Sequence, residues 1–250
     1  MVDHGQMKLG KQPPKIDLRT LRLARYLTSN LPTPPPSCDW TNGQSDWGMM
    51  LNDNLGDCTI AAVAHAIQVW TLVINQQITV SDDVVQQYYE TWDGYNPADP
   101  STDQGGVEVD VLNNWRASSF AGHKLLAYAD PDPRNILHVK QSIALFGGVY
   151  IGISLPVSAQ NQEVWDAVDG PDGEPGSWGG HAVFVAAYDA DTLTCITWGA
   201  PKKMTWAFWH KYCDESHALL SPDFMTQNGQ FPSGFDLAQL QADLEVITGA

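Results

Sequence analysis

The pattern of apolar and polar positions changes part-way along this chain of 250 residues. Residues 59–70 are rich in Ala and apolar almost all round, which predicts a helix buried through the centre of a domain. Further helices are expected over residues 81–91, 107–118 and 135–146, where the last one ends at a Gly-Gly pair. The first part of the chain is therefore predicted to be mainly helical.

The second part carries short apolar runs that are typical of strands. These runs cover residues 149–155, 181–188, 193–198 and 204–209, and turns separate them. The intervening residues 156–180 form a long loop rich in Gly and Asp, and loops of that length usually carry function or are disordered. Helices followed by antiparallel strands indicate an α+β fold, closed by one more helix over about residues 236–247.

Three segments are expected from the distribution of proline and from the length. A stiff, extended Pro-rich stretch over residues 31–36 ends an N-terminal arm, residues 1–37. Residues 38–220 are long enough for one domain with a sizeable core, and residues 221–250 form a C-terminal extension with one helix packed on it.

The charge balance limits the partners. Acidic residues number 29 against 13 basic ones, a formal charge of −16, which repels nucleic-acid phosphates and anionic membranes. No run approaches the roughly 18 apolar residues of a membrane span, and the polar, basic N-terminus lacks the apolar core of a signal peptide. A cytoplasmic location is the expectation, with export by a non-standard route left open.

The cysteines indicate reactivity rather than a scaffold. Four cysteines are too few for a disulfide framework at this length, and they contain no CxxC pair that would suggest structural zinc. Cys195 and Cys213 are expected to be small buried apolar residues. Neither a metal nor a cofactor is expected.

Cys58 stands apart because it begins the predicted buried helix. The unpaired N–H groups and the positive dipole end of a helix favour thiolate over thiol. Among the seven histidines, only His181 begins an apolar strand, and Gly179 and Gly180 before it let another chain approach closely. His65 lies about 10 Å along the same helix from Cys58, too far for proton transfer. Cys58 is therefore the predicted nucleophile and His181 its base.

The order of these motifs resembles that of the papain-like cysteine peptidases over roughly residues 39–213. The resemblance implies a papain-like α+β fold and acyl transfer through a Cys-His thioester. It implies that Asn52, six positions before Cys58 where Gln is usual, donates to the oxyanion. It also implies that Gly105 and Gly106 hydrogen-bond an extended substrate.

The resemblance fails at the third catalytic position. Aligning Thr197-Trp198-Gly199 with the family's Ser-Trp-Gly places Ile196 where the family has Asn, and Ile cannot accept a hydrogen bond. Thr197, or an acid elsewhere, is left to orient the imidazole. Trp198 is expected to pack over His181 and shield it from solvent.

The predicted function is hydrolysis of peptide or other amide bonds. Two alternatives stay open: an acyltransferase or transpeptidase that uses the same thioester, and an inactive papain-like binding module, an alternative that Ile196 keeps open. The arm before Pro34 is short for a propeptide of this family, and whether it inhibits the site is left open.

Overall fold

The computed structural model describes residues 4–15, 21–27, 33–224 and 237–248. The helices are α1 (Cys58–Val73), α2 (Asp82–Tyr88), α3 (Glu108–Ala117), α4 (Ile136–Phe146), α5 (Trp206–Tyr212) and α6 (Leu237–Thr248). The strands are β1 (Cys38–Asp39), β2 (Ala127–Ala129), β3 (Val149–Leu155), β4 (Gly179–Tyr188), β5 (Thr192–Thr197), β6 (Ala200–Thr205) and β7 (Cys213–Leu220).

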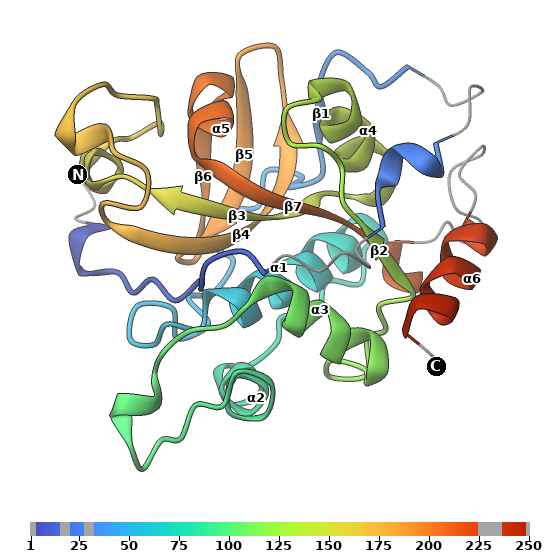
Figure 1. Cartoon of the computed structure of the whole chain (residues 1–250), viewed down its shortest axis with the longest axis horizontal. Coiled ribbons are helices and arrows are strands. Elements are labelled where there is room, and N and C mark those ends of the chain that lie inside the picture. Colours follow the sequence, from blue (N-terminus) through green and yellow to red (C-terminus); the bar gives the residue numbers. More distant parts are fainter. Residues whose placement is uncertain (1–3, 16–20, 28–32, 225–236, 249–250) are drawn as a thin grey trace.

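One antiparallel sheet organises the described part of the chain. Its strand order is β2-β7-β3-β4-β5-β6, and β1 adds to β4. Figure 1 shows α1 along one face of the sheet, with α2 and α3 beyond it and α4 and α5 on the other face. The side chains of β4 alternate accordingly: Phe184 packs with α1, whereas Val183 and Val185 pack with α4 and α5. The predicted α+β class is confirmed.

Helix α1 is the centre of the helical half. Every residue from Cys58 to Thr71 is buried, as its apolar circumference predicts. Near its C-terminal end, Trp70 packs edge-on against Phe184 at 5.7 Å between ring centroids, and its indole N–H donates to the carbonyl of Phe146 at 2.9 Å. The helix that begins with Cys58 is thus fixed against the sheet along its length.

The predicted strand over residues 204–209 is wrong beyond Thr205. The Thr205 side chain accepts the Phe208 N–H at 3.0 Å and so caps α5, which places Phe208, Trp209 and Tyr212 on one buried helical face. Strand β7 was not predicted, because four consecutive polar residues occupy its positions 214–217. None of the helices in the described ranges is both long and apolar enough to cross a membrane.

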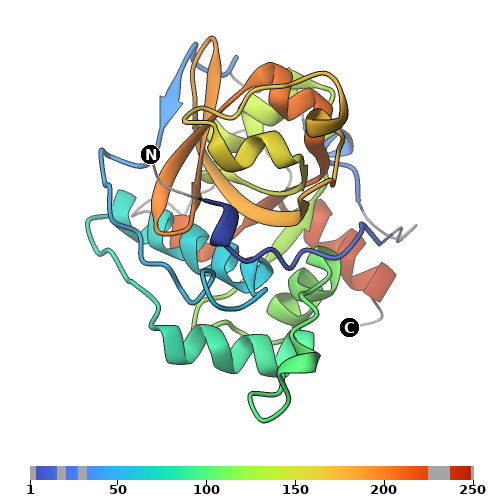
Figure 2. The same ribbon diagram turned by 90° about the vertical axis from the view of Figure 1, so that its left-hand side faces the viewer.

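Both ends of the chain contact the body. Figures 1 and 2 show the dark-blue segment after the N-terminus crossing the molecule between the sheet and the helices α1 and α3. At the other end, α6 lies beside β2 (Figure 1), and the Tyr26 hydroxyl donates to Asp243 at 2.8 Å. Residues 8–12 of the predicted arm therefore pack against the folded domain.

Candidate active site

Cys58 and His181 are brought together where α1 begins and β4 begins. The Ala182 N–H donates to Sγ of Cys58 at 3.4 Å, so the sulfur lies against the strand residue that follows His181. Both side chains are buried, and Cys58 has no disulfide partner. The predicted nucleophile and base thus lie at one point of the fold, although 123 positions separate them in the sequence numbering.

Thr197 is the hydrogen-bond partner of the imidazole. Its Oγ1 lies 2.7 Å from Nε2 of His181, while Nδ1 is buried and has no hydrogen-bond partner among the described residues. Ile196 points into the core that surrounds α1. Thr197, one residue after the position that aligns with the family's Asn, therefore contacts His181.

Trp198 stacks on the same histidine. The two rings lie 4.7 Å apart at 18° between their planes, and the indole also stacks with His4 of the arm at 5.2 Å. Trp198 has φ of +47°, an unusual value for a non-glycine residue, and Gly199 follows with φ of +75°. This strained turn between β5 and β6 sets the indole over the imidazole.

Asn52 lies close to Cys58 in the preceding loop, but its amide is already engaged. Nδ2 donates to the Leu55 carbonyl and to Oδ1 of Asp57, each at 3.2 Å. An oxyanion role needs a substrate to replace one of these bonds. That role of Asn52 stays a prediction.

The glycine pair is tied to the nucleophile loop by two side chains. The Tyr89 hydroxyl accepts the Gly105 N–H at 2.9 Å and donates to Asp103 at 2.6 Å. Asp103 in turn accepts the Gly56 N–H at 2.9 Å. Tyr89 and Asp103, which sequence reasoning missed, thereby fix the spacing between Gly105 and the loop that leads into Cys58.

Residues 8–12 of the arm run between Gly106 and Gly180, through a space that we call the groove. The Gly106 N–H donates to the Gly10 carbonyl at 2.9 Å, and the Gln12 N–H returns a bond to Gly106 at 2.8 Å. On the opposite side the Lys11 N–H donates to the Gly180 carbonyl at 3.1 Å. Gly106, predicted to hydrogen-bond an extended substrate, and Gly180, predicted to let another chain approach closely, therefore both bind the backbone of the protein's own arm.

The fit of the arm leaves no room for a side chain at Gly10. A Cβ there would lie 1.6 Å from the carbonyl oxygen of Gly56, and a Cβ on Gly105 would lie 1.5 Å from that of Gly10. Backbone oxygens on both sides cannot rotate away as a side chain could. Glycine at position 10 is required for this docked state.

Burial under the arm suppresses ionisation of the pair. Burial raises the pKa of the Cys58 thiol to about 12, although the N–H groups of Ala182 and Gly10 act in the opposite direction. Burial also lowers the pKa of His181 to about 3. With the arm in place, the two groups are a neutral thiol and a neutral imidazole near pH 7.

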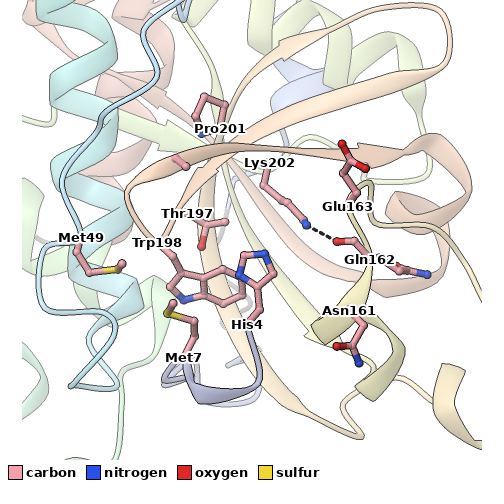
Figure 3. A pocket seen from close by; sticks show the side chains of 11 residues that line it. His4, Met7, Met49, Asn161, Gln162, Glu163, Thr197, Trp198, Pro201 and Lys202 are labelled. Atoms are coloured by element: carbon pink, nitrogen blue, oxygen red, sulfur yellow. Dashed lines mark hydrogen bonds between the residues drawn. The ribbon is translucent and has the colours of Figure 1, made fainter. Parts of the chain in front are cut away.

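A cavity of about 730 Å³ lies beside Thr197 and Trp198, the two residues that contact the imidazole (Figure 3). Thr197 and Trp198 line it together with His4 and Met7 of the arm, and Lys202 hydrogen-bonds the Gln162 carbonyl at its edge. Residues 161–163 of the long loop also line the cavity. The loop over residues 156–180 therefore borders the candidate site.

The fold is that of the papain-like cysteine proteases. No family model and no curated protein sequence matches the chain. Similar solved structures include xylellain, a cysteine protease from Xylella fastidiosa, with a TM-score of 0.66 and 16% identity over 86% of this chain and 96% of that one. They also include procathepsin L 3 of Tenebrio molitor larval midgut, with a TM-score of 0.57 and 12% identity over 87% of this chain and 77% of that one. Bromelain of Ananas comosus is similar with a TM-score of 0.54 and 13% identity over 74% of this chain and 99% of that one.

Proposed function

We propose that this chain is a cysteine hydrolase that cleaves peptide or related amide bonds, with Cys58 as nucleophile and His181 as acid and base. The observation that carries the proposal is the arrangement around one imidazole. Thr197 engages Nε2, which leaves the buried Nδ1 for proton transfer, and the next residue of the strand contacts the Cys58 sulfur. The inactive binding module was considered because Ile196 cannot accept a hydrogen bond from the imidazole, and Thr197 supplies that acceptor.

The first half of the reaction forms a thioester. His181 takes the thiol proton through Nδ1, and the Cys58 thiolate attacks the carbonyl carbon of the substrate. The tetrahedral intermediate collapses when the imidazolium gives its proton to the leaving amine. Water, deprotonated by the same imidazole, then attacks the thioester carbon and releases the acid and the free thiol.

The oxyanion needs donors at the start of α1. The Cys58 backbone N–H lies in the first turn of the helix, where N–H groups have no intrahelical acceptor, and the helix dipole adds positive potential. Asn52 supplies a second donor once substrate displaces its bond to Leu55 or Asp57. Each donor is worth about 3 kcal/mol in the transition state.

The arm holds this machinery latent. Residues 8–12 bind the groups intended for substrate backbone, and the Gly10 amide approaches the sulfur. Hydrolysis therefore requires the arm to leave the groove.

The test uses E-64, the epoxide thiol trap present in the bromelain structure, on the full chain with Gly10→Ala, which displaces the arm. We expect one equivalent of E-64 on Cys58 by peptide mass mapping and cleavage of an unfolded protein such as casein. The Cys58→Ala counterpart should do neither. Slow labelling at the rate of a free thiol, with no cleavage, would establish the binding module, and amide products with added amines would establish the transferase.

A further inference from the structure

The arm places one side chain, that of Lys11, into a buried acidic pocket beside the candidate site. Its Nζ lies 3.0 Å from Oδ1 of Asp214 and 3.0 Å from Oε1 of Glu215, and the lysine side chain is only 1% exposed. Gly152 on β3 makes the space, because a Cβ there would lie 1.9 Å from Cε of Lys11. A lysine that is this deeply enclosed is held by a built recess rather than a surface contact.

The floor of this acidic pocket is formed by Glu108 and His217. The carboxyl group of Glu108 is completely buried, and Nε2 of His217 lies 3.5 Å from both Glu108 and Glu215. Nδ1 of His217 lies 2.5 Å from Asp130. Burial lowers the pKa of His217, but Asp130, Glu215 and Glu108 outweigh it and raise the pKa well above its ordinary value.

The pocket is short of positive charge unless a second cation enters. Among the described residues, the carboxyl groups of Glu108, Asp130, Asp214 and Glu215 surround the imidazolium of His217 when Lys11 is absent, while Lys15 and Arg22 line the surface pocket beside them. Burial and the neighbouring Glu215 raise the pKa of Glu108 well above its ordinary value and favour its neutral form, so the charge that an occupant meets is that of Asp214 and Glu215, the two ion-pair partners of Lys11. Leaving such groups unpaired is costly, so the pocket favours an occupant that carries a positive charge.

The position of the pocket connects it to substrate binding. Lys11 donates its backbone N–H to Gly180, and the amides on either side of it bond to Gly106. Any extended peptide that replaces the arm on Gly106 and Gly180 brings a side chain to the mouth of the same recess. The arm therefore shows which chemistry the recess accepts.

We propose that, once the arm has left, the pocket formed by Glu108, Gly152, Asp214 and Glu215 selects substrates with a lysine or arginine side chain near the cleaved bond. This inference rests on the proposed hydrolase function. A divalent metal is a poorer occupant, although Glu108, Glu215 and His217 bring ligand atoms within 4.8 Å of one another. His217 is held protonated by Asp130, and an imidazolium cannot coordinate a metal.

The first experiment measures binding and needs no hydrolysis. In the full chain that carries Gly10→Ala to release the arm and Lys11→Ala to empty the pocket, the peptide Lys-Leu-Gly-Lys-Gln, which copies residues 8–12, is added during alkylation of Cys58 by iodoacetamide. We expect protection of the thiol, and about tenfold weaker protection when norleucine replaces the second lysine, because its charge-assisted bonds are lost. Equal protection by both peptides overturns the inference. Lys8→Ala, at an exposed position of the same arm, is the matched control.

The second experiment measures selectivity in the same doubly substituted chain with fluorogenic peptide libraries scanned one position at a time. At one position kcat/KM for Lys or Arg should exceed that for Leu by at least about tenfold. Glu215→Gln or the more exposed Asp214→Asn should remove most of that preference, whereas Glu174→Gln on the surface should keep it. Cleavage with no basic preference at any position overturns the inference alone. If the lysine peptide protects the thiol better than the norleucine peptide but no peptide is cleaved, the pocket binds a basic side chain and the proposed hydrolase function is wrong.

Discussion

The hydroxyl of Thr197 lies 2.7 Å from Nε2 of His181, across two neighbouring strands of one sheet. Threonine can accept the Nε2–H, and that tautomer places the lone pair on Nδ1. The strand pairing between β4 and β5 fixes the distance, because Phe184 is directly opposite Ile196. The tautomer proposed above thus depends on the hydroxyl of Thr197, whereas the resemblance to papain-like peptidases implied an amide at the position before it.

Thr197→Val should lower kcat of the Gly10→Ala chain by about fivefold, because the imidazole loses one neutral hydrogen bond worth about 1 kcal/mol. Thr197→Ser should restore most of the activity, since it keeps the hydroxyl. The pH profile of kcat/KM separates orientation from folding: the acid limb should move with Val and return with Ser. Equal kcat values and superimposable profiles for all three chains would show that Thr197 plays no part in positioning.

Gly10→Ala should release the arm. The added Cβ would lie 1.6 Å from a backbone oxygen of Gly56, so residues 8–12 cannot keep their bonds to Gly106 and Gly180. A loss of only about 1.4 kcal/mol from docking exposes the site tenfold more often. The rate of Cys58 alkylation at pH 8 should therefore rise by at least about tenfold.

The control for this release is Gln6→Ala, which changes an exposed residue of the same arm. Thermal unfolding should show that both variants keep the fold. If the thiol of Gly10→Ala is alkylated no faster than that of Gln6→Ala, the arm does not control access to Cys58.

The pH dependence of alkylation should differ between the docked and the released chain. Burial is the largest influence on Cys58 and raises its pKa to about 12, so in the wild type the thiolate fraction grows about tenfold per pH unit through pH 9 without a plateau. Release of the arm admits water, which stabilises the thiolate. This gain is larger than the stabilisation lost with the hydrogen bond from the Gly10 N–H, because burial has the largest effect on the pKa. Gly10→Ala should therefore reach its plateau at a lower pH. Identical profiles would contradict burial by the arm as the cause.

The proximity of Cys58 and His181, the pair proposed to react, could be predicted from sequence because each residue occupies a distinctive local position. Cys58 begins an all-round apolar helix, and His181 begins an apolar strand after two glycines. These are local signals that survive without knowledge of the tertiary fold. The α+β class followed for the same reason, since helical and strand periodicities are separate along the chain.

The acidic pocket could not be predicted, because its members come from three distant elements. Glu108 begins α3, Glu215 and His217 lie on β7, and Lys11 belongs to the arm. The polar residues that form the pocket also disguised β7 as a loop, since strand patterns are recognised by apolar alternation. Helix α5 was likewise predicted as a strand, because its aromatic residues are typical of strands. The Thr205 side chain that caps the helix is not recognisable as a cap from the sequence pattern.

Tyr89→Phe should weaken substrate binding rather than the chemical step. The lost hydroxyl leaves the buried Gly105 N–H without its acceptor and cuts the link through Asp103 to Gly56, a cost of about 1–3 kcal/mol. Because Gly105 and Gly106 hold the extended chain, KM of the Gly10→Ala enzyme should rise by about five- to tenfold while kcat changes little. The half-buried Tyr95→Phe, whose ring stacks on Tyr89, is the matched control and should leave both constants unchanged. A fall in kcat at constant KM would place Tyr89 in support of Cys58 instead of the substrate, because Asp103 also fixes the loop before the nucleophile.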